Sequence, residues 1–143
     1  MKAAVTKRLV LDASVALAWC FEDERTAYSE SILDMAEDGS EFRVPAIWPF
    51  EVANALLVAE RRKRITTARV TALLERIGRL AILVESISAD HAFSPILAAA
   101  RQLQLTEYDA AYLELAAREA LPMATLDAKM RRAAQSAGIE LVE

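Results

Sequence analysis

Cysteine, histidine, glycine and proline are all scarce in this sequence of 143 residues, and each scarcity excludes something. The single cysteine, Cys20, excludes an intramolecular disulfide and a cysteine-based zinc site. The single histidine, His91, excludes a histidine-rich metal site. Three glycines supply no glycine-rich phosphate loop, which excludes dinucleotide-binding and P-loop folds. Three glycines and four prolines beside 29 alanines favour many helices joined by short connections.

Basic tails and long apolar runs are scarce as well. Lys and Arg number 17 against 21 Asp and Glu, so the net charge is −4 and no basic tail points to nucleic acid. Residues 9–21 faintly resemble a signal peptide, but Asp12 interrupts them and bulky Trp19 precedes Cys20 where a small residue belongs. No other uncharged stretch approaches the roughly 20 residues of a membrane span. We therefore expect a soluble cytoplasmic protein with no membrane partner and with Cys20 as a core thiol.

Length and composition predict one folded domain over residues 1–143. Apolar residues make up 55% of the chain and charged residues 27%, as in globular proteins of this size. The pattern predicts strands at 8–12, 42–46, 81–84, 123–126 and 139–142, and helices at 13–21, 26–38, 49–62, 66–78, 89–104, 106–120 and 127–137. We expect Gly39 and Gly138 to stop two helices, and Pro95 to bend or restart one. The alternation predicts an α/β fold, a parallel sheet of about five strands between two layers of helices.

Four acidic residues fall at the starts of predicted helices. Asp12 and Asp127 each end a strand and begin a helix. Glu51 and Asp109 each lie in the first turn of a helix. If the first and fourth strands are parallel neighbours, these carboxylates can converge at one rim of the sheet, where ligands of such folds bind. Each acid alone also suits a helix start as a cap or as a partner of the helix dipole, so capping stays an alternative.

Convergent carboxylates need something to offset their repulsion. Two of them about 4 Å apart repel by roughly 4 kcal/mol at an effective dielectric constant of 20. No basic residue lies within two positions of Asp12, Glu51 or Asp109, and Lys129 lies near only Asp127. A hard divalent cation is the natural remedy, and oxygen ligands of this kind suit Mg²⁺ or Mn²⁺. Such ions commonly bind the phosphate groups of substrates and activate water.

Four segments resemble, in order and spacing, the motifs of PIN-domain nucleases, the family of the VapC toxins. Residues 10–15 (VLDASV) resemble the opening strand of that family, and residues 50–56 (FEVANAL) resemble its E-x-x-N-x-L motif. Residues 105–113 (LTEYDAAYL) resemble the L-T-x-Y-D-A-A-Y-L segment, and residues 124–127 (ATLD) resemble the T-x-D motif. The resemblance extends from about residue 8 to the end of the chain.

This resemblance implies a PIN-like three-layer α/β/α sandwich and an Mg²⁺-dependent endoribonuclease in which Mn²⁺ can substitute. It implies that the protein is the toxin of a VapBC pair, with an RNA substrate, a VapB-type antitoxin and a homodimeric state. Motif by motif, it assigns catalytic and metal-binding roles to four acids and supporting roles to two hydroxyls: Asp12, Glu51, Asp109 and Asp127, with Ser14 and Thr125. Many relatives carry a further acid where this chain has Ala128 and Lys129, which counts against a tightly held second metal ion.

A dense basic run, residues 61–64 (RRKR), ends the third predicted helix. Its arginines, Arg61, Arg62 and Arg64, are candidates for contacts with the RNA backbone. The alternative is that these charges complement the negative end of the helix dipole.

The aromatic residues are expected to serve packing first. Trp19, Phe21, Trp48 and Phe50 suit a core or an interface better than base stacking. Tyr108 and Tyr112 are four residues apart on one helical face, so we expect them to pack rather than to catalyse.

The acids admit three other interpretations. A phosphoacceptor receiver domain or an aspartyl-nucleophile hydrolase would place a second acid close after Asp12, where this chain has Ala13 and Ser14. The remaining alternative is a catalytically weak PIN-like module that binds RNA or an antitoxin, with the acids acting as helix caps. Metal-dependent turnover distinguishes this module from the nuclease.

Overall fold

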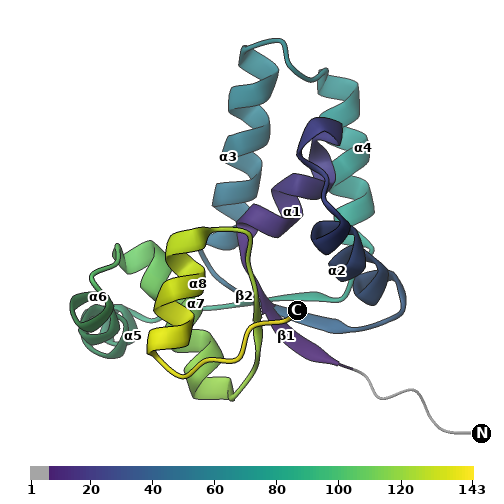
Figure 1. Cartoon of the computed structure of the whole chain (residues 1–143). Coiled ribbons are helices and arrows are strands. Elements are labelled where there is room, and N and C mark those ends of the chain that lie inside the picture. Colours follow the sequence, from purple (N-terminus) through teal and green to yellow (C-terminus); the bar gives the residue numbers. More distant parts are fainter. Residues whose placement is uncertain (1–6) are drawn as a thin grey trace, which may run out of the picture.

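A computed structural model describes residues 7–143 and places a parallel sheet between two groups of helices (Figure 1). The first six residues of the predicted domain lie outside the described residues. In chain order the elements are β1 (Arg8–Leu11), α1 (Ala13–Cys20), the 3-10 helix η1 (Glu22–Glu24), α2 (Ala27–Glu37), β2 (Glu41–Pro45), α3 (Trp48–Arg61), α4 (Thr67–Gly78), β3 (Ile82–Glu85), α5 (Ala89–His91), the π-helical segment η2 (Ala92–Ile96), α6 (Leu97–Leu103), α7 (Glu107–Glu119), β4 (Met123–Ala124) and α8 (Ala128–Ser136).

The strands lie in the order β3-β2-β1-β4 and are all parallel. In the central strand β1, Val10 pairs with Arg43 of β2 on one side and with Met123 of β4 on the other. Parallel strands share one carboxyl edge, so the residues that follow β1 and β4 meet there. The predicted α/β class is confirmed, and the condition for convergence of the acids is met, because β1 and β4 are parallel neighbours.

Among the described residues the sheet has four strands rather than the predicted five. Residues 139–142, the expected fifth strand, make a single bridge between Leu141 and Met123. Two backbone hydrogen bonds hold this segment, from Met123 N to Glu140 O and from Val142 N to Met123 O, both 2.9 Å long. Because β4 itself is only two residues long, its outer edge offers too short a template for a longer ladder.

Helices cover both faces of the sheet, with α1–α4 on one side and α5–α8 on the other (Figure 1). The core forms against β1 and β2, whose Leu9, Val10, Leu11 and Phe42 are almost completely buried. Cys20 is also buried, as predicted for a core thiol, and burial raises the pKa of this thiol to about 11. None of the helices within residues 7–143 combines the length and the apolar character that a membrane crossing requires.

The chain ends its helices where the sequence predicts. Gly39 and Gly138 follow α2 and α8 with φ angles of 94° and 74°, a left-handed conformation that glycine adopts without a Cβ clash. Pro95 lies within η2, where the predicted helix over 89–104 widens into a π-helical segment before α6. Proline lacks a backbone N–H, so the regular hydrogen-bond ladder is interrupted at this position.

Candidate active site

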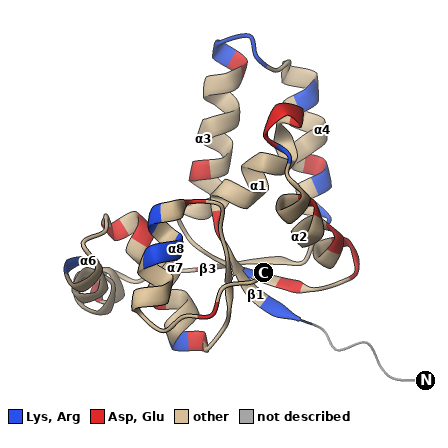
Figure 2. Cartoon of the chain, in the orientation of Figure 1, with Lys and Arg blue, Asp and Glu red and all other residues tan. Residues whose placement is uncertain are grey.

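At the carboxyl edge of the sheet, the four predicted acids lie close enough for their charges to affect pKa values within the group. Asp12 follows β1, Asp127 precedes α8, and Glu51 and Asp109 come from the first turns of α3 and α7. The negative charges of Asp109 and Asp127 both raise the pKa of Asp12, after the larger effect of its own burial. Acidic segments at the base of α3 and in the loop before α8 lie at this edge (Figure 2). Sequence-distant carboxylates therefore interact here.

Asp12 lies at the centre of a hydrogen-bonded group. It is 7% exposed, and its Oδ2 accepts hydrogen bonds from Ser14 Oγ at 2.6 Å and Thr125 Oγ1 at 2.8 Å. Burial raises the pKa of Asp12, and the two hydroxyls partly offset the rise. Asp12 occupies the N-cap position of α1, yet within the described chain its side chain makes no capping hydrogen bond. Capping therefore does not account for this acid.

The two hydroxyls also tie Asp12 to the loop after β4. Ser14 Oγ accepts from the backbone N–H of Leu126 at 3.0 Å, and Thr125 Oγ1 accepts from that of Asp127 at 3.0 Å. Arg131 of α8 donates to the carbonyl of Thr125 at 3.1 Å. Each hydroxyl thus donates to the carboxylate and accepts from the loop, which fixes the direction of both hydrogen bonds.

Glu51 has a hydrogen-bond partner that the sequence did not predict. Its Oε1 accepts a hydrogen bond from the Tyr112 hydroxyl at 2.7 Å, and Tyr112 is completely buried in the core. Burial and the neighbouring Glu51 charge raise the pKa of Tyr112, so the phenol stays protonated and donates. The prediction that Tyr112 packs is incomplete, because this residue also orients an acid. The signal was its position three residues after Asp109, on the same face of α7.

Asp109 and Asp127 differ in their use at helix starts. Thr106, not Asp109, caps α7 by accepting from the Asp109 backbone N–H at 3.1 Å. Burial and the charge of Asp127 raise the pKa of Asp109, while Lys129 lowers it. Asp127 does cap α8, because its Oδ1 accepts from the backbone N–H of Met130 at 3.0 Å. Helix capping therefore uses one carboxylate oxygen of Asp127, whereas the Asp109 side chain does not cap its helix.

Counter-charges distinguish these acids from others on the surface. Glu114 lies 2.9 Å from His91 and 3.1 Å from Arg118, and Glu37 lies 2.6 Å from Arg76. Over residues 7–143, none of the four site acids forms a salt bridge with a Lys, Arg or His. Lys129 lowers the pKa of Asp109 without forming a salt bridge with it, so repulsion among the carboxylates still favours cation binding.

The donor set fits a hard divalent cation in kind, because every candidate ligand is an oxygen. As the side chains stand, no three His, Cys, Asp or Glu residues in the described part of the chain are placed to hold a metal ion together. Holding an ion would therefore require the carboxylates to rotate toward one another. Glu51 and Asp109 are half-buried and Asp127 is exposed, so these side chains have room for such rotation.

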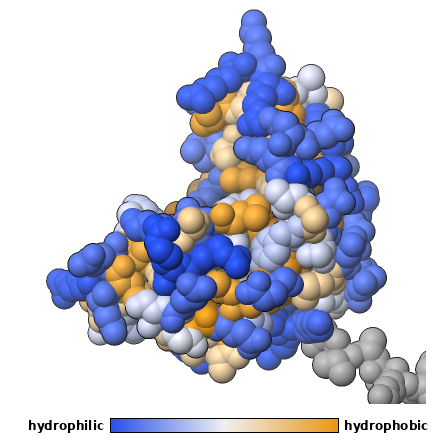
Figure 3. All heavy atoms as spheres, in the orientation of Figure 1, coloured by the Kyte–Doolittle hydropathy of each residue, from blue (hydrophilic) through white to orange (hydrophobic). Residues whose placement is uncertain are grey.

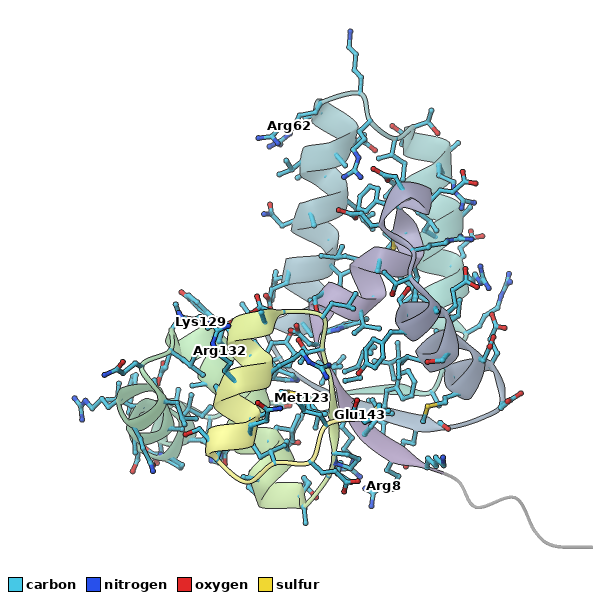
Figure 4. The ribbon with its side chains drawn as sticks, viewed as in Figure 1. Arg8, Arg62, Met123, Lys129, Arg132 and Glu143 are labelled. Atoms are coloured by element: carbon cyan, nitrogen blue, oxygen red, sulfur yellow. The ribbon has the colours of Figure 1, made fainter. Side chains whose placement is uncertain are left out.

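The predicted basic residues lie at the far end of α3. Basic residues colour the loop that joins α3 to α4 (Figure 2), and Arg62 projects from it (Figure 4). Arg61 and Arg62 are exposed. Arg64 is already engaged: it donates to both carboxylate oxygens of Asp23, at 2.9 and 3.0 Å, and lies 4.2 Å from the Phe21 ring centre.

A groove of about 600 Å³ extends from Arg62 and Arg64 to Ser14, which donates a hydrogen bond to Asp12. Leu17, Phe21 and Val58 belong to its apolar lining, and Phe21 lies against Arg64. Apolar residues are exposed where the arm formed by α3 and α4 meets the rest of the molecule (Figure 3). The groove therefore offers a mainly apolar lining with charged residues, Glu24, Arg62 and Arg64, and with the hydroxyl-bearing Ser14 beside Asp12.

The family model described as PIN domain matches residues 9–136. Solved structures with the same fold include PAE2754 from Pyrobaculum aerophilum, with a TM-score of 0.68, 20% identity, and coverage of 90% of this chain and 84% of that chain. VapBC2 from Rickettsia felis, bound to a DNA fragment from its promoter, has a TM-score of 0.65 and 12% identity, and the match covers 94% of this chain and 97% of that chain. FitAcB from Neisseria gonorrhoeae has a TM-score of 0.62 and 16% identity, and the match covers 94% of this chain and 96% of that chain. No curated protein sequence matches the chain. The family indicated by the four motifs is confirmed, and the chain belongs to the PIN domain family.

Proposed function

We propose that this protein is an Mg²⁺-dependent endoribonuclease, with Mn²⁺ able to substitute, and that it acts as the toxin of a VapBC-type pair. The carrying observation is the buried Asp12 carboxylate, oriented by Ser14 and Thr125 at the carboxyl edge of the sheet. Three further acids share its neighbourhood, and the residues described include no basic side chain in a salt bridge with any of them.

In this mechanism Asp12, Glu51 and Asp109 would hold the ion, and Asp127 would add its second carboxylate oxygen, because Oδ1 caps α8. The chemistry that a bound ion would supply is polarisation of the phosphodiester and a lower pKa for the attacking water. Ser14 and Thr125 keep the buried carboxylate of Asp12 directed toward the edge. These residues therefore supply charge and orientation, the two requirements for in-line hydrolysis of a phosphodiester.

The toxin role is supported by family membership and by the shared fold with VapBC2 and FitAcB. We propose a VapB-type antitoxin as partner and a homodimer as the active form. The groove between α1 and α3 suits an antitoxin segment with apolar residues, because Leu17, Phe21 and Val58 line it. Acidic residues on the same segment would complement Arg62 at its rim.

The first test is cleavage of a mixed cellular RNA pool by antitoxin-free protein, with Mg²⁺, with Mn²⁺ and with EDTA. We expect cleavage with either ion and none with EDTA. Cleavage that persists in EDTA would contradict the metal-dependent mechanism. Tight RNA binding without cleavage under any condition would favour the alternative, a PIN-like module that binds RNA without turnover.

Neutralising Arg61 and Arg62 is expected to weaken RNA binding and flatten its salt dependence. Each phosphate contact that is lost removes about one released counterion, so the slope of log K against log salt should fall by roughly 0.7 per arginine on a single strand. The measurement is RNA affinity at several salt concentrations for Arg61→Gln with Arg62→Gln. Arg101→Gln, an exposed arginine of α6, is the control. An unchanged slope would remove these arginines from the RNA path.

Removing the Tyr112 hydroxyl is expected to lower cleavage by about tenfold or more, because changes to groups that orient metal ligands cost roughly 10- to 100-fold in affinity or activity. Tyr112→Phe should also raise the Mg²⁺ concentration needed for half-maximal cleavage, since Glu51 loses the donor at 2.7 Å. The matched control is Tyr28→Phe, whose hydroxyl donates to the carbonyl of Val142 at 2.8 Å. Equal Mg²⁺ requirements in the two variants would assign Tyr112 a packing role only.

A further inference from the structure

We propose that an apolar pocket beside the acids is a subsite for one guanine base of the RNA strand, with Glu107 as the residue that selects guanine. This inference rests on the proposed function for the presence of RNA. It adds a base preference that the mechanism itself does not contain.

The pocket lies between the starts of α3 and α7 and the segment that leads into η2. Its volume is about 270 Å³, just below the range of sites for drug-sized ligands, which suits a single planar ring system. Ile47, Ile87 and Ile96 form apolar walls, and Phe50 and Tyr108 stand at its border. Both aromatic residues are largely exposed, Phe50 at 73% and Tyr108 at 64%.

Sequence adjacency places this pocket next to the reacting centre. Phe50 directly precedes Glu51 in α3, and Tyr108 directly precedes Asp109 in α7. Neighbouring residues on a helix project about 100° apart, so each helix presents an acid to the site and an aromatic ring to the adjoining sector. A nucleotide whose phosphate lies at the acids can therefore turn its base toward the two rings. Aromatic rings bind single-stranded bases by stacking, whatever their sequence.

Glu107 adds a carboxylate side chain to the otherwise apolar and aromatic lining of the pocket. Its Oε1 is buried and has no hydrogen-bond partner among the described residues. The helix dipole of α7 explains an acid in the first turn but supplies no partner for this oxygen. Buried polar atoms are nearly always hydrogen-bonded, so this acceptor would gain a partner if the Glu107 side chain turned Oε1 toward a donor in the pocket that the same residue lines.

A carboxylate accepts hydrogen bonds and donates none, and this asymmetry selects among the bases. Guanine presents two adjacent donors on its Watson–Crick edge, the ring N1–H and the exocyclic amine. Adenine and cytosine place their amine beside a ring nitrogen that is an acceptor, and uracil places its N–H between two carbonyls. Only guanine therefore offers donors to both carboxylate oxygens once the Glu107 side chain turns the buried Oε1 toward the pocket. Single-stranded RNA exposes this edge for recognition.

The test measures base preference without cleavage. Four fluorescein-labelled pentanucleotides, UUGUU, UUAUU, UUCUU and UUUUU, are titrated against Asp12→Asn protein, and binding is followed by fluorescence polarisation. We expect UUGUU to bind about tenfold or more tightly than the other three, as for a bidentate base contact. Adding Glu107→Gln should remove this preference. Phe50→Ala or Tyr108→Ala should instead weaken all four pentanucleotides alike, by about tenfold.

Phe93→Ala is the matched control, because Phe93 is as exposed as Phe50, at 73%, but does not line the pocket. Equal binding of the four pentanucleotides, or a guanine preference that survives Glu107→Gln, would overturn the proposal. Light scattering on the same variants tests the other possible occupant, a second copy of this chain. If Phe50→Ala separates an oligomer into monomers and leaves base preference unchanged, the pocket is a contact between copies.

The outcome for this subsite is separable from that for the nuclease. Guanine preference in Asp12→Asn protein, together with no RNA cleavage by the unmodified protein, would support the pocket and contradict the catalytic proposal. Metal-dependent cleavage with equal binding of all four pentanucleotides would contradict the pocket alone. Mapping the cut sites gives an independent readout, in which guanine should recur at one fixed position relative to the cut and lose that position in Glu107→Gln.

Discussion

Replacing Asp12 by asparagine is expected to lower metal-dependent RNA cleavage by more than about a hundredfold. Changes to residues that only orient metal ligands already cost roughly 10- to 100-fold, and Asp12 is proposed to bind the ion directly. The expected loss reflects charge rather than shape. Asparagine has the same size, and its carbonyl oxygen can accept the hydrogen bonds from Ser14 and Thr125 that now measure 2.6 and 2.8 Å.

The measurement compares initial cleavage rates of Asp12→Asn and the unmodified protein, prepared identically, over a range of Mg²⁺ concentrations. Asp38→Asn is the matched control, because Asp38 is an exposed acid at the end of α2, away from the edge of the sheet. Thermal unfolding of all three proteins checks that the fold is retained. Equal cleavage by Asp12→Asn and the unmodified protein would indicate a contaminating nuclease and remove Asp12 from the centre.

The local sequence predicts the residues of the site that follow or end a strand, Asp12 and Thr125. Asp12 follows a short apolar run and Thr125 ends another, so one assumption about strand order is enough to bring them together. The pairing of Val10 with Met123 satisfies that assumption. Right-handed crossovers between parallel strands then place α1–α4 on one face and α5–α8 on the other, as observed (Figure 1).

Contacts between distant, polar surface segments could not be predicted in the same way. Arg64 pairs with Asp23, 41 residues away, and nothing in the local pattern selects this acid over others. The sequence therefore predicts all three arginines of the basic run as candidate RNA contacts, although Arg64 is already paired with Asp23 in the folded protein. The expected fifth strand fails for a related reason, because its length depends on the partner strand β4 and not on its own composition.

Replacing Asp109 by asparagine is expected to abolish most cleavage, by more than about a hundredfold, without lowering the stability of the metal-free protein. Burial and the negative charge of Asp127 raise the pKa of Asp109, which means that the folded protein disfavours its charged form. A neutral side chain removes that disfavoured charge. The free energy of unfolding in EDTA should therefore stay equal or rise, as measured by chemical denaturation at neutral pH.

The matched comparison is Thr106→Ala, one turn earlier in the same helix. Thr106 Oγ1 accepts from the Asp109 backbone N–H at 3.1 Å, so its removal should cost about 1 kcal/mol of stability, as for other N-caps. Asp109→Ala should cost less than Thr106→Ala, because the Asp109 side chain is not the cap of α7. The opposite order, with cleavage per folded molecule retained in both Asp109 variants, would make Asp109 a structural residue. The expected order instead separates Thr106, which caps the helix, from Asp109, three residues later, which is proposed to bind the metal ion.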